Sequence, residues 1–72
     1  MSGEARVIKV NGEQRRSHAA SLTDLLREEG LDPARRGIAI ALDGSVVARA
    51  AWADTPLAEG SVVEIVKPAA GG

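Results

Sequence analysis

The sequence ends in Lys-Pro-Ala-Ala-Gly-Gly at positions 67–72, and this segment offers one reactive group, the α-carboxylate of Gly72. Its last residues are small, and glycine has no Cβ, so a narrow channel in another protein could admit them. A carboxylate is a poor electrophile, so it must be activated by a partner that encloses it away from water, typically as an acyl-adenylate. We therefore predict that Gly72 is the reactive residue. The residues predicted to thread the partner are Pro68, Ala69, Ala70 and Gly71.

Side chains suited to catalysis are few. His18 is the only histidine, and Ser17 beside it would point to the opposite face of a strand, so the two cannot form a dyad. Glu28 and Glu29 are adjacent in a predicted helix and do not face each other. The sequence contains no cysteine, which excludes disulfides, thiolate metal ligands and cysteine nucleophiles within it. We predict a protein that is not an enzyme and that holds no metal.

Composition and charge indicate one small soluble domain. The 72 residues are 44% hydrophobic and 1% aromatic, which is near the lower limit for a fold stabilised by its core alone. The net charge of −1 is close to balanced, so nucleic acid and anionic membranes are not expected partners. No apolar stretch has the length of a leader or a membrane span, and we predict a cytoplasmic protein.

Four predicted strands are paired by two turn dipeptides, Asn11-Gly12 and Asp43-Gly44. Both dipeptides tolerate the positive φ angles of a tight hairpin turn. The predicted strands of the two hairpins cover residues 6–10 and 13–20, then 38–42 and 45–49. A fifth predicted strand, residues 62–66, is apolar on both faces, which favours an interior position in a sheet.

Residues 21–30 carry the signals of a helix. Ser21 suits the N-cap, and Asp24 places negative charge in the first turn. Leucines at positions 22, 25 and 26 form one apolar stripe. Gly30 suits the left-handed C′ position, and Leu31 would then contact the last of these leucines in a Schellman arrangement. A second, single helical or 3₁₀ turn is predicted over residues 55–60, where proline follows threonine.

The order of these elements predicts an α+β roll, in which one helix covers one face of a mixed sheet of four to five strands. A right-handed crossover would place the last strand parallel beside the first. This is the β-grasp arrangement of ubiquitin. We predict a β-grasp domain over residues 1–66 and a flexible tail over residues 67–72, and a different pairing of the same strands stays open.

From Val7 to Gly72 the chain resembles the ThiS family, the sulfur carriers of thiamine biosynthesis. The matching segments are VNGE (10–13), SLTDLL (21–26) and the long segment from Gly37 to the terminal glycine pair. Within that long segment, VVARAAW (46–52) is similar to the family's V-P-R-x-x-W, and LAEGSVVEIV (57–66) is similar to L-x-x-G-D-x-[IV]-E-[IV]. Three positions depart from the family pattern. Ala48 stands in place of proline, Ser61 in place of aspartate, and Asp43 where asparagine is common.

The resemblance implies a carrier that reacts through its own C-terminus. A ThiF-type activating enzyme would use ATP to adenylate the carboxylate of Gly72. A sulfur donor such as a cysteine desulfurase would then convert it to a thiocarboxylate. A ThiG-type thiazole synthase would accept that sulfur. The carrier itself would bind no cofactor and, because the thiocarboxylate holds the sulfur, would need no cysteine.

Two further residues have both a structural and a partner-binding interpretation. Trp52 either packs near the second hairpin or contacts a partner. Arg49 either braces the fold, for example by pairing with a carboxylate on the sheet, or contacts a partner. We also expect an exposed apolar patch on the sheet beside the tail to dock partners, although the sequence does not identify its residues.

Several alternatives remain open at this point. The small, MoaD-like subunit of molybdopterin synthase shares the fold and the terminal glycines, but it is usually longer, more aromatic and without the arginine-to-tryptophan spacing. A carrier could also serve another sulfur pathway, such as cysteine or siderophore synthesis. A non-covalent β-grasp docking or RNA-contacting module, or a ubiquitin-like modifier joined through isopeptide bonds, would use the same fold.

Overall fold

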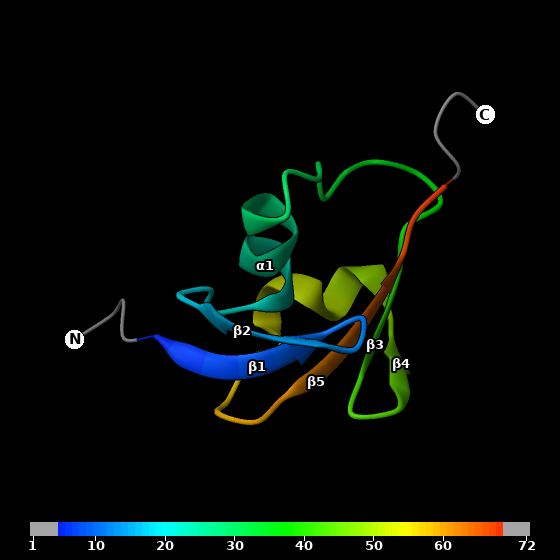
Figure 1. Cartoon of the computed structure of the whole chain (residues 1–72). Helices are drawn as coiled ribbons and strands as arrows, with labels where there is room; N and C mark the ends of the chain where they lie inside the picture. The colour runs from blue at the N-terminus through cyan, green and yellow to red at the C-terminus, as the bar shows by residue number, and fades with distance from the viewer. Residues whose placement is uncertain (1–4, 69–72) are drawn as a thin grey trace.

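The computed structural model describes residues 5–68. Its elements are β1 (Arg6–Val10), β2 (Glu13–Ser17), α1 (Leu22–Glu28), β3 (Ala39–Leu42), β4 (Ser45–Val47), the 3₁₀ helix η1 (Arg49–Asp54) and β5 (Val62–Val66). The strands form one sheet in the order β2-β1-β5-β3-β4. β5 is central, parallel to β1 and antiparallel to β3, and α1 packs on one face of the sheet (Figure 1). The predicted α+β, β-grasp roll is confirmed.

Both predicted hairpins form. Asn11 and Gly12 have φ angles of 50° and 86°, and Asp43 and Gly44 have 51° and 87°, so each turn has the two positive φ angles that a tight hairpin requires. The strands are shorter than predicted. β2 ends at Ser17, β3 begins at Ala39, and β4 ends at Val47, after which the chain enters η1.

The signals at the ends of α1 act as predicted. The Ser21 hydroxyl accepts a hydrogen bond from the Asp24 amide at 3.2 Å. At the other end Gly30 has a φ of 77°, and the amides of Gly30 and Leu31 donate to the carbonyls of Arg27 and Leu26 at 3.0 and 2.8 Å. These two bonds are the Schellman pattern. Within residues 5–68, no helix has both the length and the apolar character needed to traverse a bilayer.

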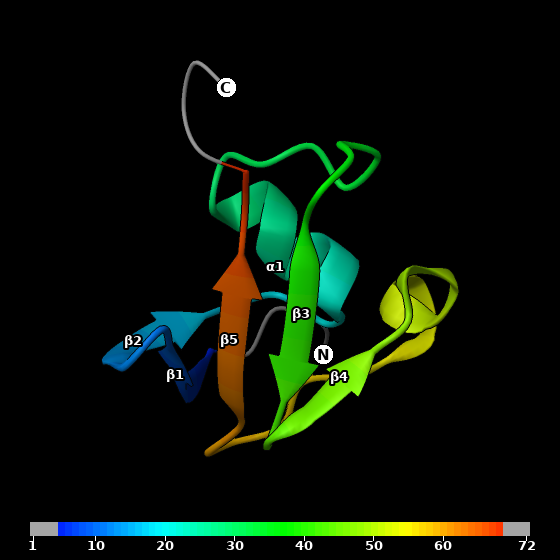
Figure 2. The ribbon, with the colours of Figure 1, turned by 90° about the vertical axis from the view of Figure 1, so that its right-hand side faces the viewer.

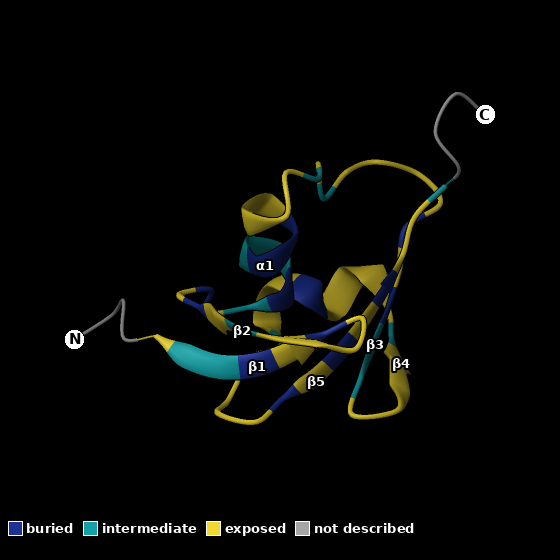
Figure 3. Ribbon diagram, viewed as in Figure 1, coloured by how far each residue is buried: buried dark blue, intermediate teal, exposed yellow. Residues whose placement is uncertain are grey.

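The core lies between α1 and the sheet (Figure 3). Alternate residues of each central strand point toward the helix and are buried. The buried hydrophobic residues are Ile8, Val10, Ala19, Leu22, Leu25, Leu26, Ile38, Ile40, Trp52, Leu57, Val63 and Ile65. The core is therefore aliphatic with one aromatic ring, as the composition predicted.

The short helix lies earlier in the chain than predicted. We expected a helical turn over residues 55–60, but η1 covers Arg49–Asp54 and ends before Thr55, whose φ and ψ of −99° and 108° are extended. A residue that precedes proline is disfavoured from helical angles. Pro56 therefore ends this helix instead of beginning one, and it forms an isolated β-bridge with Ser21.

The side chain of Asn11 extends the pairing between β1 and β5 past the end of β1. Its Nδ2 donates to the Ile65 carbonyl at 3.2 Å, and its Oδ1 accepts from the Ile65 amide at 2.7 Å. The backbone amide of Asn11 also donates to the Val63 carbonyl. In the second hairpin, Asp43 accepts from the Val62 amide through Oδ1 at 2.9 Å. Both hairpin turns thus hold β5 through a side chain.

We predict that replacing the side-chain amide of Asn11 by a carboxylate lowers the stability of the protein, whereas replacing the carboxylate of Asp43 by an amide does not. Asn11→Asp loses the donor to Ile65 and places a carboxylate oxygen against that carbonyl, so the free energy of unfolding should fall by about 1–3 kcal/mol. Asp43→Asn keeps the acceptor oxygen and should change the free energy of unfolding by less than about 0.5 kcal/mol. Urea unfolding of both variants measures the difference, and equal effects would contradict the role given to the Asn11 amide.

Candidate functional site

β5 leads directly into the predicted tail. Val66 is its last residue, Lys67 is exposed and Pro68 is half-buried. The predicted reactive residue Gly72 and the threading residues Ala69, Ala70 and Gly71 lie outside the described residues. The structure therefore fixes the base of the tail. Val66 pairs with Ala39 in β3, so the position from which the tail starts is set by the centre of the sheet.

The sheet face opposite α1 carries an apolar area, here called the open-face patch (Ala39, Ala41, Val46, Val62 and Val66). Cross-strand pairing joins Ala39 to Val66 and Ala41 to both Val46 and Glu64, so these side chains share one face. Val46, Val62 and Val66 are 81%, 41% and 64% exposed. Figure 2 looks onto this face, with α1 behind it. The apolar patch expected beside the tail is thereby assigned to residues.

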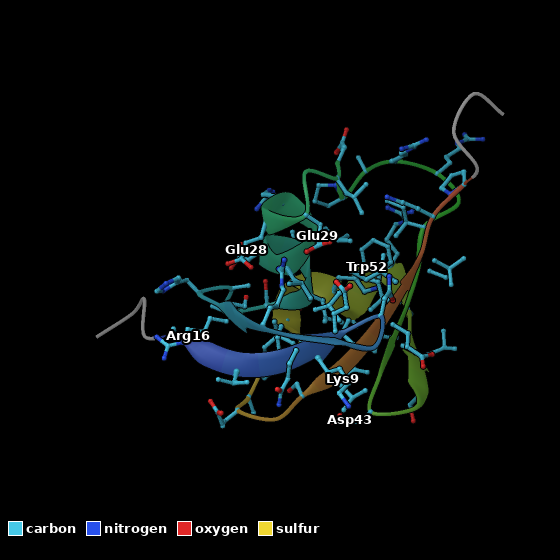
Figure 4. The ribbon with its side chains drawn as sticks, in the orientation of Figure 1. Lys9, Arg16, Glu28, Glu29, Asp43 and Trp52 are labelled. Atoms are coloured by element: carbon cyan, nitrogen blue, oxygen red, sulfur yellow. The ribbon has the colours of Figure 1, made fainter. Side chains whose placement is uncertain are left out.

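Charged and polar side chains lie beside the open-face patch and within it. Lys9 in β1 is paired with Val62 in β5 and with Gln14 in β2, the strand that also carries Arg16. The side chains of Lys9, Gln14 and Arg16 are exposed. Lys9 lies on the side of the sheet away from α1 (Figure 4). Glu64 is exposed on the same face, between Val62 and Val66 in β5 and opposite Ala41 in β3. The open-face patch therefore combines apolar side chains with one carboxylate among them and with cationic and polar side chains at its β1–β2 side, a mixture of polar and apolar groups that is usual in protein–protein interfaces.

The loop between α1 and β3 passes over the end of β5 (Figure 2). Gly37 in this loop approaches the tail so closely that a Cβ built on it would lie 2.8 Å from Cγ of Pro68. Arg35 and Arg36, which precede Gly37, are exposed, as is Lys67. Three cationic side chains therefore lie next to the contact between Gly37 and Pro68, two of them on the loop and one on the tail.

The structure places Trp52 in the core, and it places the side chain of Arg49, the first residue of η1, against the loop between α1 and β3. Trp52 is 3% exposed, and its Nε1 donates to the Val47 carbonyl at 2.9 Å. A direct contact between this ring and a partner would require the ring to leave the core. The Arg49 guanidinium lies 4.5 Å from the ring centroid and donates to the carbonyls of Pro33 and Arg35. Arg49 therefore braces the fold, and within residues 5–68 its guanidinium bonds to carbonyls and not to a carboxylate.

The carboxylates at the end of α1 hold the helix to β2. Glu28 accepts from the Ser17 hydroxyl at 2.7 Å and from the His18 amide at 3.0 Å, and both Glu28 and Glu29 pair with Arg15 (Figure 4). Ser17 is buried and His18 exposed, as predicted for opposite faces. In the part of the chain that the structure describes, no group of three or more His, Asp or Glu side chains could hold a metal ion.

Comparison with known families decides what kind of domain this is. The family model for ThiS matches residues 8–72. The chain belongs to the ThiS family. The crystal structure of the thiamine biosynthesis protein (ThiS) from Geobacter metallireducens is 25% identical and superposes with a TM-score of 0.70, covering 92% of this chain and 99% of that one. No curated protein matches the sequence. ThiS family membership confirms the predicted resemblance and supports the role of a sulfur carrier, which is not a catalyst.

The three departures from the ThiS pattern keep the local geometry. Ala48 has a φ of −63° and a ψ of 144°, which are angles that proline also adopts. The Ser61 hydroxyl accepts from the Ala58 amide at 2.9 Å, a bond that an aspartate could accept too. Asp43 holds Val62 through Oδ1, an oxygen that asparagine shares. None of these changes alters the base of the tail.

Proposed function

We propose that this protein carries sulfur for thiazole formation in thiamine biosynthesis on the C-terminal carboxylate of Gly72. The observation that carries the proposal is the ThiS family match, which extends through residue 72. The partners are a ThiF-type activating enzyme that consumes ATP, a sulfur donor such as a cysteine desulfurase, and a ThiG-type thiazole synthase. The carrier itself binds no cofactor.

The reaction at Gly72 has two steps. A carboxylate oxygen attacks the α-phosphate of ATP, pyrophosphate leaves, and the C-terminus becomes an acyl-adenylate. With hydrosulfide as the sulfur source, sulfur attacks the acyl carbon and AMP leaves with one of the former carboxylate oxygens. The product is a thiocarboxylate, which holds the sulfur as a nucleophile. Enclosure by the activating enzyme is needed because water would otherwise hydrolyse the adenylate.

The open-face patch is the surface on which we expect the activating enzyme to dock. Residues 67–72 can extend at most about 20 Å, so the enzyme's adenylation site must lie within that distance of Val66. An enzyme that receives so short a tail has to cover the sheet next to it. The exposed cations Arg35, Arg36 and Lys67 favour acidic side chains around the point where the tail enters.

Intact-mass measurement tests the proposal. The protein is incubated with ATP, a ThiF-type enzyme and hydrosulfide, and the expected mass increase equals the replacement of one oxygen by sulfur at the C-terminus. A parallel reaction with a known ThiS carrier establishes that the enzyme is active. No change in mass under these conditions would contradict the proposal.

Transfer to a synthase then tests the pathway. The thiocarboxylated protein is offered separately to a ThiG-type thiazole synthase and to the large subunit of molybdopterin synthase, each supplied with the small-molecule substrate that accepts the sulfur in its own reaction. Loss of the sulfur-dependent mass increase only with the thiazole synthase is the expected result. Loss only with the molybdopterin synthase subunit would assign the carrier to that pathway instead.

A further inference from the structure

We infer that Gly37 is a positioning residue that sets the direction in which the tail leaves the domain. The segment that acts on the tail is the collar loop (residues 32–37), which Arg49 holds in place and which meets Pro68 through Gly37. The inference rests on the proposed function, because direction matters only if the tail is delivered to a partner. Neither Gly37 nor Arg49 touches the reacting carboxylate in this scheme.

The contact between Gly37 and Pro68 leaves no room for a side chain. A Cβ at position 37 would lie 2.8 Å from Cγ, 3.5 Å from Cδ and 3.6 Å from Cβ of Pro68, and the φ of Gly37 is 86°. The proline ring cannot rotate away, because it fixes its own backbone φ. Gly44 has nearly the same φ, 87°, with nothing within 4 Å of the corresponding position. Glycine at position 37 is therefore required by close approach as well as by backbone conformation.

The collar loop is held by hydrogen bonds within it and from outside it. The backbone carbonyl of Asp32 accepts a hydrogen bond from the Arg35 amide at 2.9 Å. The side-chain carboxylate of Asp32 accepts one from the Ala34 amide at 2.9 Å. The Arg49 guanidinium bridges two carbonyls of the loop, that of Pro33 and that of Arg35, the latter at 2.6 Å. A planar guanidinium can satisfy two acceptors at once, so Arg49 fixes the loop at two points.

Arg49 is in turn anchored to the core. Its guanidinium lies 4.5 Å from the ring centroid of Trp52, and the ring is buried and bonded to the Val47 carbonyl (Figure 4). A continuous series of contacts therefore runs from the core through Arg49 and the collar loop to Pro68. The arginine-to-tryptophan segment thus acts on the tail indirectly, by holding the loop that the tail passes.

An error in direction at Pro68 affects delivery and not the chemical step. Only three residues separate Pro68 from Gly72, so a change of angle at their base moves the carboxylate away from the entry of a narrow channel. Once the tail is seated, the reacting groups are unchanged. The expected signature is a higher KM for the carrier with a nearly unchanged kcat.

Adenylation kinetics with a matched glycine variant test the inference. ATP–pyrophosphate exchange by a ThiF-type enzyme is measured with wild-type carrier, Gly37→Ala and Gly44→Ala. Both variants place a Cβ on a residue with φ near 86°, so both introduce a side chain at a positive φ. Gly37→Ala should raise the carrier's KM by about tenfold with kcat within about twofold, because it alone disturbs the tail. Gly44→Ala should leave both parameters near wild type, and an equal KM for the two variants overturns the inference.

Removal of the proline ring supplies a rescue. Pro68→Ala lacks the Cγ and Cδ atoms that a side chain at position 37 would meet, so the double variant Gly37→Ala/Pro68→Ala should have the KM of Pro68→Ala alone. Additive effects of the two substitutions on KM overturn the inference. Arg49→Lys keeps the charge but cannot bridge two carbonyls, and it should also raise KM. If Gly37→Ala does not fold, Arg49→Lys replaces it in the kinetic test. A KM of Arg49→Lys equal to that of the wild type then overturns the inference.

A measurement without a partner separates this inference from the proposed function. In the free protein, nuclear Overhauser contacts between Gly37 and Pro68 are expected in the wild type and in Gly44→Ala, and their absence from the wild type overturns the inference. Wild-type protein that shows these contacts but supports no ATP–pyrophosphate exchange overturns the proposed function, while the packing of the collar loop on Pro68 stands.

Discussion

Deletion of Gly72 is expected to reduce adenylation by the ThiF-type enzyme by more than about 100-fold. The shortened chain still ends in a carboxylate, that of Gly71, but this group falls about 3.5 Å short of the position that Gly72 would reach. Reacting atoms must approach within about 3–3.5 Å in the correct orientation, and a misplacement of about 1 Å can already lower a rate by about 100-fold. ATP–pyrophosphate exchange measures the loss.

Two companion variants show whether length and width of the tail both matter. Gly72→Leu keeps the length and the carboxylate but adds a side chain, and it should be as inactive as the deletion because the channel excludes it. Ala69→Ser changes polarity with little change in size and should remain active. The urea midpoint of all three should match the wild type. Normal exchange by the protein that lacks Gly72 would show that the carboxylate of Gly71 is adenylated equally well, and it would contradict the required length of the tail. Absence of exchange with the wild-type protein as well would favour a non-covalent binding module.

Val66→Asp is expected to weaken binding of the activating enzyme by about tenfold or more, the second-largest effect. Val66 is 64% exposed at the end of β5, so a docked enzyme would bury it together with the base of the tail. Burial of an unpaired carboxylate costs more than the apolar contact it replaces, and disruption of a hot-spot residue in an interface costs about 2 kcal/mol or more. Isothermal titration calorimetry measures the dissociation constant.

Matched substitutions define how far the interface extends. Val66→Thr keeps the β-branched shape without a charge and should bind within about threefold of wild type. Val46→Asp places the same charge on β4, separated from β5 by β3, and its effect reports whether the enzyme covers the far part of the open-face patch. Unchanged binding by Val66→Asp, with Gly72 still required, would place the docking surface elsewhere.

Local signals in the sequence were sufficient for most of the fold. The positive φ angles of Asn11-Gly12 and Asp43-Gly44 depend only on the types of those residues. The capping of α1 by Ser21 and Gly30 depends on groups that lie within one helical turn of each cap. The one misplaced element, η1, shows the limit of such signals. Pro56 was interpreted as the start of a helical turn, but it is the residue before which η1 ends.

The sequence predicts the chemistry of the candidate site but not the surroundings of that site. Gly72 and the residues that thread a partner follow from residue type and order alone, and they remain a prediction because they lie outside the described residues. The open-face patch could not be assigned, because β5 is apolar on both faces. Periodicity shows that Val62 and Val66 share one side and Val63 and Ile65 the other, but only the packing of α1 decides which side is covered.

The sequence by itself determined the two hairpins, α1 and the roll, because these depend on backbone preferences and periodicity that neighbouring residues encode, while Gly72 as the reactive end stays a prediction. The tertiary structure alone decided how β5 and the base of the tail at Pro68 are held. Asn11 bonds to Ile65, Arg49 to the collar loop, and Gly37 meets Pro68. These contacts join residues far apart in the chain, so no local pattern records them. They arise only when the hairpins and the helix dock, which brings their ends together around the last strand.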